Sequence, residues 1–159
     1  MPDPFLTSAR DLLRRARDDM RAAIEGLPAD ALNWRPAGDD TNSIAVLATH
    51  SLTSTREWLS AAVGEPPPER DRDSEFEASA RDAGELLALA DSLFEECLSL
   101  VDKSRTVDWA ALRSQWDPDT GVQLLAAWAL LHALGHLREH LGQMLLTRQL
   151  WEAQAARPD

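Results

Sequence analysis

Apolar residues recur at intervals of three and four through four long segments of the chain, and this spacing constrains the fold more than any other feature. Such spacing gathers apolar side chains on one face of a helix, where they can be buried against a core. The predicted helices cover residues 4–26, 41–63, 79–103 and 121–154. The sequence therefore predicts an all-α fold, a four-helix bundle forming one domain over residues 1–159.

The connections between the helices decide their order and direction in such a bundle. Thr41 or Asn42 can cap the second helix, and Gly64 with the three prolines after it ends that helix. The crossover of residues 65–77 that follows is charged and has no apolar periodicity. Short loops would make all neighbouring helices antiparallel, whereas this crossover is long enough to allow one parallel pair.

The segment before the fourth helix is not plainly helical. Residues 104–120 carry scattered tryptophan and aliphatic residues, and residues 117–121 have the composition of a turn. A short strand pair or an extended cover over the bundle is expected here.

The fourth helix is apolar on almost every side between residues 122 and 134, so we expect it to be buried all round. It would then be the central helix or a helix that also meets a second subunit. We expect a homodimer, with Trp128 as the best candidate for a contact residue.

Charge and cysteine content limit the class of protein. The net charge of −11 opposes binding to nucleic acid, and the arginines between residues 10 and 21 are interleaved with acids as on a solvated, ion-paired helix face. No segment is apolar over the length needed to span a membrane, and the N-terminus lacks the pattern of a signal peptide. The single Cys97 excludes an intrachain disulfide and is interpreted as an inert core residue. We expect a cytoplasmic protein with no nucleic-acid or membrane partner.

Three of the four histidines stand one helical turn apart, at His132, His136 and His140. Residues four apart lie on one helix face, so two imidazoles at this spacing can bind one metal ion with a third from a neighbouring helix. Successive positions drift about 40° around the helix, and three in a row can scarcely bind the same ion. One pair together with His50 is the economical set, and the spacing does not decide which pair. Three protein ligands leave a coordination position for water or substrate, as in catalytic zinc sites.

Three stretches of sequence resemble the DinB superfamily. Residues 32–36 (LNWRP) and 42–50 (NSIAVLATH) are similar to its Trp-x-Pro turn, which leads into a helix of the type Ser-Ile-x-x-(Leu/Val)-x-x-His. Residues 136–143 (HLREHLGQ) are similar to its His-x-x-x-His-x-Gly-Gln signature. The resemblance implies an up-down-down-up bundle in which the long crossover joins two parallel helices.

The resemblance also implies a divalent metal ion held by His50, His136 and His140. His132 lies outside this triad, and we interpret it as a packing residue or a neighbour of the ligands. Gln143 either lines the pocket or packs. Imidazole nitrogen suits several divalent metals, of which we expect zinc or nickel.

Relatives of this kind include thiol-dependent S-transferases and the mycothiol-dependent maleylpyruvate isomerase. The expected function is therefore that of a metal-dependent transferase that uses a low-molecular-weight thiol and a small-molecule substrate. One alternative is a non-catalytic, stress-related or structural metal-binding protein. The other is a metal-dependent hydrolase, which needs a general base near the ion. Glu57 and Glu139 are the candidates for that base, although Glu139 points about 100° away from the ligand face.

Overall fold

The computed structural model describes residues 2–114 and 123–156, and four long helices dominate this part of the chain. The long helices are α1 (Pro4–Ile24), α3 (Ile44–Val63), α5 (Ala83–Lys103) and α6 (Ala126–Ala155). Short elements connect them: α2 (Ala29–Asn33), the 3-10 turn η1 (Gly38–Asp40), α4 (Arg72–Phe76), β1 (Leu112–Ser114) and β2 (Gln123–Leu125).

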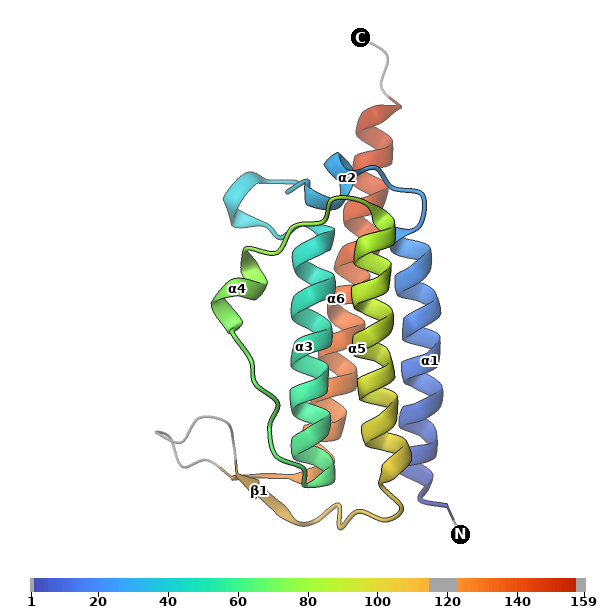
Figure 1. Cartoon of the computed structure of the whole chain (residues 1–159), viewed down its shortest axis with the longest axis vertical. Helices are drawn as coiled ribbons and strands as arrows, with labels where there is room; N and C mark the ends of the chain where they lie inside the picture. The colour runs from blue at the N-terminus through green and yellow to red at the C-terminus, as the bar shows by residue number, and fades with distance from the viewer. Residues whose placement is uncertain (1, 115–122, 157–159) are drawn as a thin grey trace.

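The four long helices form a bundle with the expected up-down-down-up order (Figure 1). From the N-terminus α1 runs up, α3 and α5 both run down, and α6 returns upward. In the bundle α3 packs against α5 and α6, and α1 packs against the same two helices. The crossover between α3 and α5 returns the chain to the top along the outside of α3 and makes these two helices parallel.

Because each long helix has two packed neighbours, each also keeps an outward face. The expectation that the fourth helix is buried all round is therefore wrong for the single chain. Trp128 is 43% exposed and Leu131 is 65% exposed, whereas Ala129 and Ala133 on the inner side are buried. The same exposed side chains exclude the interpretation of the fourth helix as the central helix of the bundle.

The ends of α3 are set by local chemistry. Ser43, and not the predicted Thr41 or Asn42, is the N-cap, because its hydroxyl accepts a hydrogen bond from the backbone N–H of Val46 at 3.2 Å. Gly64 ends the helix with φ at +84°, a left-handed conformation that L side chains rarely adopt.

A short strand pair precedes α6. This was one of the two structures expected from the sequence, the other being an extended cover over the bundle. Leu112 pairs with Leu125 and Ser114 with Gln123 in antiparallel register. This pairing delays the start of α6 from the predicted residue 121 to Ala126. The predicted turn at residues 117–121 lies outside the described residues.

The arginines of α1 pair with the acids of α5, which explains why both helices carry many charges. Arg17 contacts Asp91 at 2.9 Å and Glu95 at 2.5 Å, and Arg21 contacts Asp91 at 2.7 Å. These hydrogen bonds to Glu95 and Asp91 raise the pKa of Arg17. The interpretation of this arginine segment as an ion-paired helix face is confirmed.

Cys97 lies in the core of the bundle and is fully buried. Burial raises the pKa of its thiol to about 12, so the thiolate form is scarce at neutral pH. None of the helices in the described part of the chain is long and apolar enough to cross a membrane.

Candidate metal centre

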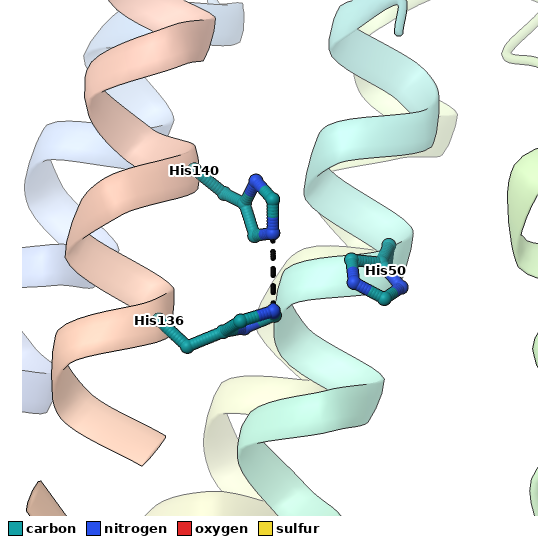
Figure 2. A group of neighbouring side chains, drawn as sticks. All are labelled: His50, His136 and His140. Carbon is teal, nitrogen blue, oxygen red and sulfur yellow. Dashed lines mark hydrogen bonds between the residues drawn. The ribbon is translucent and has the colours of Figure 1, made fainter. Parts of the chain in front are cut away.

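The structure brings the three histidines of the predicted triad together in space. His50 comes from α3, and His136 and His140 come from successive turns of α6. One ring nitrogen from each residue can be chosen so that the three lie within 4.8 Å of one another. Figure 2 shows the imidazoles of His136 and His140 extending from α6 toward α3, which carries His50. The arrangement depends on the packing of α3 against α6, which run in opposite directions.

The ring nitrogens of the α6 pair fit a metal ion. Nε2 of His136 and Nε2 of His140 lie 3.1 Å apart, close to the separation of about 3.4 Å expected for two nitrogens bound tetrahedrally to one zinc ion at about 2.1 Å. Nδ1 of His136 is buried with no hydrogen-bond partner among the described residues. Nδ1 of His140 lies 2.7 Å from Oε1 of Gln143. Gln143 thus accepts a hydrogen bond from the Nδ1–H of His140, and the lone pair on Nε2 is left to bind a metal ion.

Glu75 is a residue of this centre that the sequence reasoning missed. It lies on α4 within the crossover, and its Oε2 is 2.9 Å from Nδ1 of His50. When this carboxylate accepts the Nδ1 proton, Nε2 of His50 is left free to bind a metal. The sequence of the crossover is typical of a charged, solvated segment. It carries no signal that the side chain of Glu75 is buried, with only 4% of the residue exposed.

Arg70 holds Glu75 in place from the same crossover. Its Nε and Nη2 donate to the two oxygens of Glu75 at 2.6 and 2.8 Å, and its Nη1 donates to Oε2 of Glu57. All three side chains are less than 10% exposed. We call Glu57, Arg70 and Glu75 the buried ion cluster.

The buried ion cluster gives the histidine centre a negative environment. Burial alone would raise the pKa of Glu75, but hydrogen bonds from Arg70, Thr53 and His50 hold it below its ordinary value. Burial alone would lower the pKa of Arg70, but Glu75 and Glu57 raise it. With two carboxylates to one guanidinium, the cluster has a formal net charge of −1, which favours a cation nearby.

Two of the three histidines, His50 and His136, have lowered pKa values, so their rings are neutral and can serve as ligands at neutral pH. Burial lowers the pKa of His50, although its hydrogen bond to Glu75 opposes the shift. Burial and the neighbouring histidines lower the pKa of His136 to about 4. Neither ring has to lose a proton before it binds a metal at neutral pH.

His132 lies beside the triad and packs against tryptophan. Its ring stacks on Trp128 with centroids 4.7 Å apart and planes 8° apart, and it meets the edge of Trp58 at 4.7 Å. Its ring centroid is 5.6 Å from that of His136, yet His132 is not part of the cluster of ligand atoms. These contacts agree with the interpretation of His132 as a packing residue next to the ligands.

Neither candidate base is available to the centre. Glu57 is bound to Arg70, and Glu139 is exposed on the outside of α6.

Comparisons with known proteins agree with this architecture. The family model of the DinB superfamily matches residues 12–144. A crystal structure described as a conserved protein from Enterococcus faecalis superposes with a TM-score of 0.71 over 91% of this chain and 95% of that chain. Its sequence is 16% identical, so this similarity concerns the fold alone. No curated protein matches the sequence.

Proposed function

Because the chain belongs to the DinB superfamily, we propose that it binds one divalent metal ion, zinc or nickel, through His50, His136 and His140. We propose further that the ion serves to transfer a low-molecular-weight thiol to a small-molecule substrate. The observation that carries the proposal is the convergence of three imidazoles whose ring nitrogens lie within 4.8 Å, two of them with their Nδ1 beside an oxygen acceptor.

The protein's own part in this function is to present three nitrogen donors and to fix their protons. Glu75 holds the proton of His50 on Nδ1, and Gln143 does the same for His140. Three protein ligands leave at least one coordination position for an exogenous group. A divalent ion in this position supplies Lewis acidity and lowers the pKa of a bound thiol, whose thiolate is the nucleophile.

Two features favour an external thiol over the alternatives that use the chain's own groups. Cys97 is buried, with its pKa raised to about 12, so it does not supply the nucleophile. Glu57 is bound to Arg70 and Glu139 is exposed, so neither carboxylate is placed to activate a water molecule for hydrolysis.

Metal analysis of purified protein tests the first half of the proposal. We expect about one divalent ion per chain, with loss of the ion in His50→Ala and His140→Ala and its retention in His132→Ala. Equal loss in all three variants would refute the assignment of the triad.

Turnover tests the second half. The metal-loaded protein should conjugate chlorodinitrobenzene with a bacterial low-molecular-weight thiol, and His140→Ala should not. A loaded protein without turnover across several thiols and electrophiles would instead support the non-catalytic metal-binding alternative.

A further inference from the structure

A cavity of about 510 Å³ lies at the end of the bundle where α3 ends. It is enclosed by the last turns of α3, the loop after Gly64, the strand pair and the first turn of α6. Its volume lies in the range of about 300–1,000 Å³ that is usual for small-molecule sites. Its walls are largely apolar and include Trp58, Pro66, Leu112 and Leu124.

One cation, Arg113 of β1, lines this cavity. The Nε of Arg113 is buried, and it has no hydrogen-bond partner among the described residues. The two carboxylates that also line the cavity do not neutralise it, since Glu57 is bound to Arg70 and no ion pair joins Glu65 to Arg113 in the described part of the chain. Because this Nε is closed to solvent, a carboxylate bound in the cavity would accept hydrogen bonds from the terminal nitrogens of the same guanidinium.

Arg113 lies at the C-terminal end of α3 as well as at the cavity. Its guanidinium lies over Gly64, where an added Cβ would be 3.5 Å from Cζ, so it sits at the negative end of the α3 dipole. Two carbonyls near the end of α3 are occupied by the chain itself, because the N–H of Gly64 bonds to the carbonyl of Ala61 and the N–H of Glu65 to that of Ser60. The backbone thus supplies part of the cap of α3 without Arg113.

The cavity and the histidine centre lie along the same two helix faces. Glu57 follows His50 by two helical turns on α3, and Ala129 precedes His136 by two turns on α6, a displacement of about 10 Å along each axis. Trp58 joins the two regions, because it lines the cavity and its ring also meets His132 beside the centre.

We propose that this cavity binds an organic monocarboxylate with an apolar, aromatic body, whose carboxylate is held by Arg113. The planar guanidinium fork matches a carboxylate, and Trp58 offers an aromatic surface to the body of the ligand. The negative charges of Glu57 and Glu65 disfavour a doubly charged phosphate in the same space. The identification of this ligand as the electrophilic substrate rests on the proposed function, whereas its binding does not.

Calorimetric titration of the purified protein with naphthalene-2-carboxylate tests the proposal, with the neutral 2-naphthamide as the matched probe. A hydrogen-bonded charge pair of this kind corresponds to a factor of about 10–100 in affinity. We expect the carboxylate to bind more tightly than the amide by this factor. Equal affinity for the two probes would overturn the proposal.

Variants locate the binding. Arg113→Gln should reduce the affinity for the carboxylate to that for the amide, and Arg113→Lys should retain part of the preference. Arg105→Gln is the matched control, because Arg105 is exposed and does not line this cavity. Glu65→Gln should tighten carboxylate binding. Unchanged affinity in folded Arg113→Gln, or an equal loss in Arg105→Gln, would contradict the assignment.

His140→Ala separates this proposal from the proposed function. His140 does not line the cavity, so this variant should bind naphthalene-2-carboxylate like the wild type even when it carries no metal. If His140→Ala retains the metal while Arg113→Gln loses the probe, the metal proposal fails and the carboxylate site stands. If Arg113→Gln binds the probe normally while His140→Ala loses the metal, the reverse holds.

Discussion

Replacement of Glu75 by glutamine tests whether the buried ion cluster controls the metal centre. The carboxylate accepts one hydrogen bond from Nδ1 of His50 at 2.9 Å and two from Arg70 at 2.6 and 2.8 Å. Glutamine has nearly the same shape but offers one acceptor oxygen and one amide donor. At a site 4% exposed, water does not readily replace the lost acceptor.

Each orientation of the new amide has a cost, either to the His50 tautomer or to the contact with Arg70, and both remove the negative charge of Glu75 from beside the centre. If its NH₂ faces His50, Nδ1 must accept a hydrogen bond, and the ring proton moves to Nε2, the nitrogen assigned to the metal. If its NH₂ faces Arg70, two donors meet, and a hydrogen bond to a charged group worth about 1.5–3 kcal/mol is lost. Loss of such an outer partner of a ligating histidine weakens metal affinity by about 10–100-fold, or about 1.4–2.8 kcal/mol.

Competition with a chromophoric zinc chelator measures the affinity, and chemical denaturation measures the stability. Glu57→Gln is the matched control, because it removes another partner of Arg70 without touching His50. We expect both variants to be less stable than the wild type, and only Glu75→Gln to lose metal affinity beyond tenfold. Wild-type affinity in Glu75→Gln, or the same loss in Glu57→Gln, would refute the reasoning.

Two further predictions concern pH and assembly. The pKa of His136 is about 4 in the folded chain and about 6.5 in the unfolded chain, so the unfolded state binds the proton first. The stability that this neutral ring contributes is complete above pH 6.5, and the metal-free protein should lose up to about 3 kcal/mol of unfolding free energy as the pH falls to 4. Denaturation midpoints that rise on acidification would contradict this. We also propose the homodimer expected from the sequence, because Trp128, Leu131 and Leu146 leave an apolar outer face on α6. Sedimentation should give twice the chain mass for the wild type and a monomer for Leu131→Glu, whereas a monomeric wild type would end the proposal.

Much of the fold could be predicted because helix periodicity is local. The 3/4 spacing of apolar residues identifies the four long helices, and Gly64 marks the end of α3 within one residue. The predicted start of α6 was five residues too early, because residues 123–125 form a strand that pairs with residues 112–114. Local spacing carries no sign of such a partner.

The candidate metal centre was also predictable from the sequence only in part. Histidines four apart on α6 place two donors on one face, and the family resemblance selects His136 and His140 from the three. In the structure these two lie close to His50 and His132 is stacked on Trp128, and the proposed ligand set rests on this arrangement.

The sequence by itself determined the class of fold and placed candidate nitrogen donors on one helix face, because apolar periodicity and one-turn spacing act within single helices. Tertiary structure alone decided what surrounds those donors. Glu75 reaches His50 across 25 residues of sequence only because the crossover folds back along α3, and Arg113 enters the cavity beside α3 only because the strand pair closes that end of the bundle. Contacts of this kind depend on how whole helices and strands pack together. The sequence around the contacting residues carries no local pattern that predicts them.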